Sequence, residues 1–126
     1  FGIFSQYNYL AKNPNKLGEK DKLDHAGDMS IYSQIHEQYH PAFNKFTHQH
    51  GYYDLFLVNL EGQVIYSVFK EIDYGTNLKT GPHANSGIGQ AAQAALTANT
   101  ADSISLTDYS HYVPSYNAPA MFIASP

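Results

Sequence analysis

The sequence predicts one α+β domain, in which helices cover an antiparallel β-sheet. Residues 53–59 and 64–69 are rich in aromatic and β-branched residues, and the short connection 60–62 between them is typical of a β-hairpin. A helical pattern separates this pair of strands from a second pair near the C-terminus. Because a short connection joins each pair, the strands cannot form a parallel βαβ series, and an antiparallel sheet fits best.

Composition limits the classes of function. The 126 residues are 43% hydrophobic, which is enough for one packed core, and the formal charge of −4 with no basic patch argues against nucleic acid as a partner. All seven basic residues are lysines, so no arginine fork is present to clamp a carboxylate or a phosphate. The absence of cysteine excludes disulfides, thiol chemistry and cysteine-based zinc sites.

The N-terminal half is predicted to hold two helices. Apolar residues recur at helical spacing over residues 1–10, turn-forming residues at 13–18 end that helix, and the charged residues 16–26 form a surface loop. A second helix begins near Asp28 or Ser30, either of which can cap it. Its apolar face consists of Tyr32, Ile35, Tyr39, Phe43 and Phe46. Pro41 is expected to kink or divide this helix, and Gly51 to end it.

The hairpin is followed by an irregular segment, residues 70–85, which combines charged, hydroxyl, amide, glycine and proline residues. Long irregular segments more often carry functional residues than serve only as connections. We therefore predict that this segment closes over a small-molecule pocket on the sheet.

The C-terminal part is predicted to contain a helix and two strands. The alanine-rich residues 87–98 form a helix that Asn85 or Ser86 caps. Its buried side consists of Ile88, Ala91, Ala92, Ala95 and Leu96. Residues 103–109 alternate in polarity as a third strand does, and 118–124 form a fourth. Between them, the polar and aromatic residues 110–117 form a second loop, expected to face the first across the sheet.

Several runs of this sequence form a recognisable series. They are Asn13-Pro14-Asn15, Gly18-Glu19-Lys20, Tyr39-His40-Pro41, Gly51-Tyr52-Tyr53-Asp54-Leu55-Phe56-Leu57, Val64-Ile65-Tyr66-Ser67-Val68-Phe69-Lys70-Glu71, Thr76-Asn77-Leu78, Gly81-Pro82, Pro114-Ser115 and Pro119-Ala120. Together they resemble the extracytoplasmic sensor domain of bacterial methyl-accepting chemotaxis proteins and sensor cyclases. The resemblance covers nearly all of the chain from Asn13 onward.

The resemblance implies a PAS-like (Cache) fold, with N-terminal helices packed on one face of an antiparallel sheet and a pocket closed by loops. It also implies the periplasmic domain of a bacterial inner-membrane receptor, a homodimer, flanking transmembrane helices and a cytoplasmic signalling region. Residues 1–126 would then be one sensor domain truncated at both ends, lacking most of the first long helix and the final strand or strands. The resemblance does not name a ligand.

The residues best suited to hold a ligand lie on the second strand and the two loops. They are Tyr66, Lys70, Asp73, Tyr74, Thr76, Asn77, Tyr109, Tyr112 and Ser115. A few polar groups on an apolar wall are usual for a small-molecule pocket. The alternative is that Asp73, Thr76 and Asn77 satisfy loop backbone groups and the tyrosines pack at a strand end. Without arginine, a neutral molecule or a cation held by tyrosine faces and Asp73 becomes more attractive, and Lys70 could still anchor a small carboxylate as a point charge.

Histidines offer a second kind of site. His36 and His40 are one helical turn apart and have the spacing of a metal-binding pair, and His48 and His50 form another pair. A structural zinc ion needs four ligands, and no third or fourth is evident. The pattern therefore favours packing and hydrogen bonding beside the sheet, with no metal and no cofactor.

Three functions remain open on sequence grounds. The first is a small-molecule-sensing input domain. The second is a ligand-free dimerisation or partner-sensing module of a sensor cyclase or kinase, and the third is a histidine-based metal sensor. Enzymatic activity is not predicted, because serine, histidine and aspartate occur in no catalytic motif and the pair Gly87 and Gly89 lacks the rest of a phosphate-binding pattern.

Overall fold

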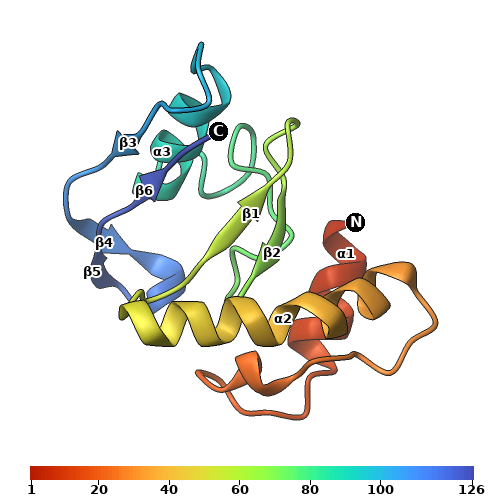
Figure 1. The fold of residues 1–126 in the computed structure, drawn as a ribbon. Helices are drawn as coiled ribbons and strands as arrows, with labels where there is room; N and C mark the ends of the chain where they lie inside the picture. The colour runs from red at the N-terminus through yellow and green to blue at the C-terminus, as the bar shows by residue number, and fades with distance from the viewer. The chain divides into compact units, whose positions relative to one another are not determined.

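Three α-helices and short antiparallel strands make up an α+β fold in the computed structural model, which describes residues 1–126 (Figure 1). The strands fall into three two-stranded sheets, whereas the sequence predicts one larger sheet. The chain divides into two compact units. The first consists of Phe1–Leu57 and Ile65–Gly75, and the second of Val58–Val64 and Thr76–Pro126.

The first unit begins with the predicted N-terminal helix. It consists of α1 (Gly2–Ser5), which continues as a wider π-helical turn (Gln6–Ala11). The loop that follows includes a short 3₁₀ turn (Lys20–Lys22), where the Asp21 side chain is buried. Residues 16–26 therefore form a loop, as predicted. The loop does not lie wholly on the surface, because its Asp21 side chain is buried.

Helix α2 (Ile31–His50) is the longest element and has well-defined ends. The Ser30 hydroxyl accepts a hydrogen bond from the Ser33 N–H at 3.0 Å, as an N-cap residue does. Gly51 ends the helix in the left-handed conformation, with φ of 68°, which glycine adopts without the usual steric penalty. The helix continues through Pro41, so this proline does not divide it.

The buried face of α2 differs from the prediction. The buried residues are Ser33, His36, His40 and Thr47, which form a polar stripe. Ile35 and Tyr39 of the predicted apolar face are 51% and 52% exposed. The polar stripe is buried because it finds hydrogen-bond partners: Ser33 accepts from the Tyr9 hydroxyl, and both histidines bond to carbonyls of the preceding loop.

The predicted hairpin forms, with strands shorter than expected. Strand β1 (Phe56–Val58) neighbours β2 (Val64–Ser67), and Gly62 has φ of 88° in the turn between them. At the open end, the Asp54 carboxylate accepts hydrogen bonds from the Ser67 hydroxyl at 2.8 Å and from the Phe69 N–H at 3.2 Å. Because the Asp54 side chain accepts the Phe69 N–H, regular pairing ends earlier than the residue pattern suggests.

In the second unit, α3 (Gly87–Leu96) forms as predicted, after Ser86. The Gln93 amide donates to the carbonyls of Leu78 and Ala84, both at 2.9 Å, and so ties the helix to the preceding irregular segment. A Cβ atom on Gly89 would collide with the backbone carbonyls of this segment. Glycine is therefore needed for the close approach of helix and segment.

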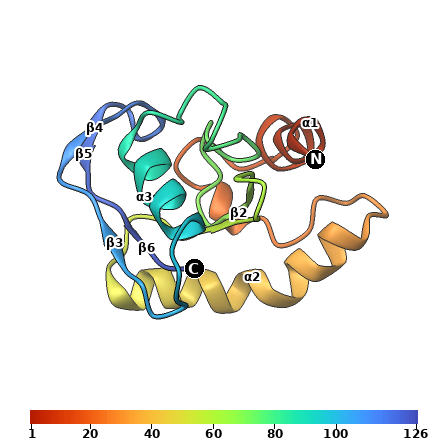
Figure 2. The ribbon, with the colours of Figure 1, turned by 90° about the horizontal axis from the view of Figure 1, so that it is seen from above.

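The C-terminal residues form one antiparallel ribbon beside α3 (Figure 2). Strands β3 (Ser105–Leu106) and β6 (Ile123–Ala124) pair, as do β4 (Ser110–Tyr112) and β5 (Ala118–Ala120). The register changes by one residue between the two ladders, which is the mark of a β-bulge. The prediction of a loop over 110–117 was therefore wrong for its first part, which is strand β4.

Candidate functional site

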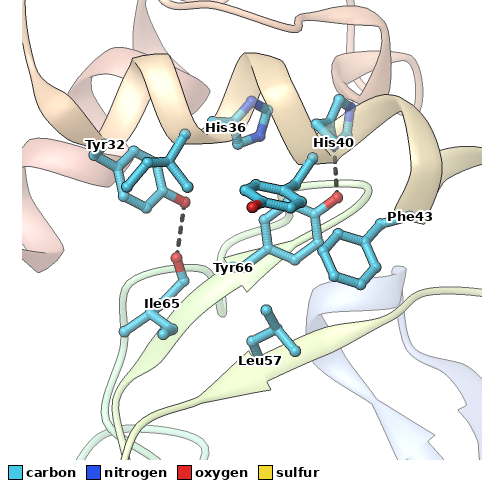
Figure 3. A pocket seen from close by; sticks show the side chains of 9 residues that line it. Tyr32, His36, His40, Phe43, Leu57, Ile65 and Tyr66 are labelled. Carbon is cyan, nitrogen blue, oxygen red and sulfur yellow. Dashed lines mark hydrogen bonds between the residues drawn. The ribbon is translucent and has the colours of Figure 1, made fainter.

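A cavity of about 350 Å³ lies between α2 and the hairpin, within the first unit (Figure 3). Helix α2 and the hairpin together line it with Tyr32, Ile35, His36, Tyr39, His40, Phe43, Leu57, Ile65 and Tyr66. None of these side chains is an acid, a lysine or an arginine. The half-exposed side chains of Ile35, Tyr39 and Leu57 leave the cavity open to solvent on one side.

Helical periodicity explains how α2 contributes six of these residues. Tyr32, Ile35, Tyr39 and Phe43 recur at steps of three and four, and such residues share one side of a helix. These four residues belong to the apolar face that the sequence predicts; its fifth member, Phe46, is not in the lining. The structure places this face along the cavity.

His40 and Tyr66 hold the middle of the lining in place. The His40 Nε2 atom lies 2.6 Å from the Asp21 carbonyl oxygen, and Nδ1 lies 2.6 Å from the Tyr66 hydroxyl (Figure 3). Because a carbonyl only accepts, Nε2 carries the proton, and Nδ1 accepts the hydrogen of Tyr66. Every hydrogen-bonding group of the His40 ring is thereby used.

His36 has the opposite tautomer. Its Nδ1 atom lies 2.6 Å from the Asp24 carbonyl oxygen and must donate to it, so Nε2 is an acceptor. Nε2 is buried and has no hydrogen-bond partner. The ring stacks on His40, with centroids 4.4 Å apart, and packs against Tyr9 at 4.6 Å.

Both histidines are neutral near pH 7. Burial, together with the nearby Lys70 ammonium, lowers the pKa of His36 to about 3 and that of His40 to about 4. No cluster of three or more histidine, aspartate or glutamate side chains is placed to hold a metal ion. The His36 and His40 rings instead anchor α2 to the Asp21–Asp24 loop through their hydrogen bonds to carbonyls.

Lys70 is fully buried and is not among the residues that line the cavity. Its Nζ atom donates to the Val68 carbonyl at 3.0 Å and lies 5.4 Å from the ring centroid of Tyr66 and 5.9 Å from that of Tyr9. Burial lowers its pKa to about 7, although the charges of Asp54, Asp21 and Asp24 act in the opposite direction. Its backbone φ of 54° is unusual for a residue other than glycine.

The hydroxyls of two tyrosines, Tyr32 in the lining and Tyr74, are hydrogen-bonded to each other. Tyr32 donates to the Ile65 carbonyl at 2.7 Å, as Figure 3 shows, and its hydroxyl also bonds to that of Tyr74. Because Tyr32 has only one hydrogen, Tyr74 is the donor of this second bond. Tyr74 is fully buried, and burial raises its pKa.

The predicted ligand residues are divided between the two units. In the first unit, Tyr66 lines the cavity, and Lys70, Asp73 and Tyr74 are buried. The other five belong to the second unit. They are Thr76, Asn77, Tyr109, Tyr112 and Ser115.

Within the second unit, Asn77 serves the loop backbone. Its side-chain oxygen accepts from the N–H groups of Lys79 and Thr80, and its amide donates to the Glu61 carbonyl. This is the alternative role that the sequence left open for it. The Thr76 carbonyl accepts the Val64 N–H at 2.9 Å.

The C-terminal candidates have different environments. Tyr109 is 65% exposed, and Ser115 is buried. Tyr112 is buried against Phe122, at 5.0 Å between centroids, and against His83 of the irregular segment at 6.1 Å. The two predicted loop regions thus meet at the His83–Tyr112 contact within this unit.

Sequence reasoning missed most of the cavity lining. The sequence places Ile35, Tyr39 and Phe43 on the apolar face of a helix, and Leu57 and Ile65 on the strands of the hairpin, without marking any of them as a ligand residue. The available signal was an apolar helix face that directly precedes an apolar hairpin. Such a pattern does not distinguish two elements in full contact from two elements with a space between them.

Comparisons with protein-family models, with curated proteins and with solved structures found no match for this chain. None of its helices combines the length and the apolar character that crossing a membrane requires.

Proposed function

We propose that this chain is the small-molecule-sensing input domain of a bacterial transmembrane chemoreceptor, with a PAS-like (Cache) arrangement, located in the periplasm. A bound ligand would favour one conformation of the domain and change the activity of a cytoplasmic signalling region. Such a shift requires different affinities of the ligand for the two conformations. The α+β fold and the motifs that resemble chemoreceptor sensor domains support this proposal.

The observation that carries the proposal is the cavity between α2 and the hairpin. Its volume of about 350 Å³ lies in the range of small-molecule sites, roughly 300–1,000 Å³. Tyrosine, histidine and phenylalanine rings dominate its wall, as is common in ligand pockets. The hydrogen bonds of Tyr32 and Tyr66 keep their rings in place without a ligand, so the site is pre-formed.

A thermal-shift screen of small metabolites against purified chain 1–126 tests the proposal. Binding to the native state stabilises it by about 2.7 kcal/mol at one hundred times Kd, which corresponds to several degrees in Tm. The shift should disappear in Leu57→Trp, which fills the mouth of the cavity. It should persist in Leu60→Trp, which changes an exposed leucine of the hairpin turn. A library without any stabilising compound, or a shift that survives in both variants, would overturn the proposal.

A second candidate function, a dimerisation or partner-sensing module, is favoured by the exposed residues of α2. Ile31, Ile35 and Tyr39 recur every four residues and are 72%, 51% and 52% exposed. Exposed apolar stripes of this kind often mark interaction surfaces. Sedimentation analysis should show a homodimer that Ile31→Glu dissociates. If Ile31→Glu dissociates the dimer and no ligand is found, this function replaces the first.

A further inference from the structure

The buried hydrogen-bond donors that line the α2–hairpin cavity already have acceptors within the protein. Tyr32 donates to the Ile65 carbonyl, and Tyr66 donates to His40 Nδ1. His36 Nδ1 and His40 Nε2 donate to carbonyls of the Asp21–Asp24 loop. The one lining nitrogen without a partner, His36 Nε2, is an acceptor. An anionic ligand therefore finds no buried donor here, and only the hydroxyl of the half-exposed Tyr39 remains at the mouth.

The charges around the cavity are equally unsuited to an anion. Lys70 is buried and is not among the lining residues, and its ammonium donates to the Val68 carbonyl. Reaching into the cavity would require the ammonium to give up that hydrogen bond. The protein has no arginine that could replace it.

A cationic ligand is disfavoured for a different reason. No carboxylate is among the lining residues. The Lys70 ammonium, 5.4 Å from the Tyr66 centroid, already places positive charge against that ring. A cationic ligand would therefore lack a counter-ion and would share the Tyr66 ring with a cation that this ring already contacts.

From these features we infer that the cavity selects uncharged aromatic or aliphatic molecules and discriminates against carboxylates and amines of the same shape. This inference rests on the proposed sensing function and specifies its ligand class. The lining residues Phe43, Leu57 and Ile65 supply apolar contact, and the tyrosine and histidine rings suit edge-to-face or stacked contacts with a flat ring.

Three probes with one ring system and different charges test the ligand class: indole, indole-3-acetate and tryptamine. The protein has no tryptophan, so indole fluorescence excited near the red edge of absorption reports the probe alone. Indole should bind at least about tenfold more tightly than either charged probe. This ratio corresponds to about 1.4 kcal/mol.

Leu57→Glu provides a variant with a reversed preference. It adds a carboxylate at the half-exposed mouth of the cavity, so tryptamine should become the preferred probe and indole-3-acetate the poorest. Leu60→Glu makes the same change at an 81% exposed turn position outside the lining, and should keep the order of the native protein.

Two results would overturn this ligand class while leaving the sensing function intact. The first is tighter binding of indole-3-acetate or tryptamine than of indole to the native protein, provided that Leu57→Trp abolishes the thermal shift of that probe, since the added tryptophan would obscure its fluorescence. The second is that indole does not bind at millimolar concentration, while the metabolite screen yields a charged ligand whose binding Leu57→Trp blocks. Failure of the screen as well would overturn both proposals.

Discussion

At the scale of single residues, His36 and His40 show how polar side chains form part of a core. Each donates to a loop carbonyl from one ring nitrogen, and the two rings stack on each other. The two tautomers differ because the partners differ: His40 accepts from Tyr66, and His36 has no donor nearby. A pair that resembles a metal site in sequence therefore anchors a loop to a helix in this structure.

Tyr66→Phe tests the hydrogen bond between Tyr66 and His40. The substitution leaves the buried His40 Nδ1 without its donor, which should lower the free energy of unfolding by about 1–3 kcal/mol. Tyr39→Phe removes a half-exposed hydroxyl from the same cavity and should change stability by less than about 0.5 kcal/mol. Urea denaturation measures both values, and equal losses in the two variants would contradict this account.

At the scale of elements, α2 carries two different stripes. Its polar stripe contacts the preceding loop and is buried, whereas its apolar residues line the cavity. Hydrophobic periodicity identifies the helix but assigns the wrong face to the core. The assignment fails because burial of Ser33, His36 and His40 depends on partners that are distant in sequence: Tyr9, Asp24 and Asp21.

Two glycines with positive φ allow a matched test of backbone strain. Gly51 has φ of 68° with open space around it, so Gly51→Ala should cost about 1 kcal/mol through its conformation alone. Gly75 has φ of 78°, and an added Cβ would collide with Ser5 and Gly2. Gly75→Ala should therefore cost clearly more in chemical denaturation. A larger loss for Gly51→Ala would show that the packing of Gly75 is described wrongly.

At the scale of the whole molecule, buried ionisable groups determine how stability responds to pH. The pKa values of His36 and His40 are lower in the folded state than in the unfolded chain, so the unfolded chain binds more protons between about pH 4 and 6.5. Both residues therefore lower stability as the pH falls through this window. Burial raises the pKa of Asp54 to about 7, which has the opposite effect over the same range.

The expected net result is a loss of stability on acidification from about pH 6.5 to 4, because two histidines outweigh one aspartate. Lys70 contributes no slope there, since its folded pKa of about 7 makes stability rise with pH only above this window. Urea midpoints measured across pH 4–7 test the prediction. His36→Gln, which can still donate to Asp24, should reduce the slope. An unchanged slope in this variant would contradict the assignment.

The sequence predicts the elements better than it predicts the site. Both long helices, the hairpin and the irregular residues 70–85 are confirmed, because N-caps, glycine stops and alanine-rich or β-rich runs are local signals. Strand β4 was missed because polar and aromatic residues gave it no clear alternation. Of the nine predicted ligand residues, only Tyr66 lines the cavity, since neighbours in sequence around residues 66–77 point into different environments.

The sequence by itself determined the α+β class, the helix ends at Ser30 and Gly51, and the lack of any arginine for an anionic ligand. These properties depend on composition and on residues close together in the chain. Tertiary structure alone decided that α2 and the hairpin leave a cavity, that Lys70 is buried outside its lining, and that the buried lining donors are engaged. Each of these depends on contacts between residues far apart in sequence, whose geometry no local pattern specifies.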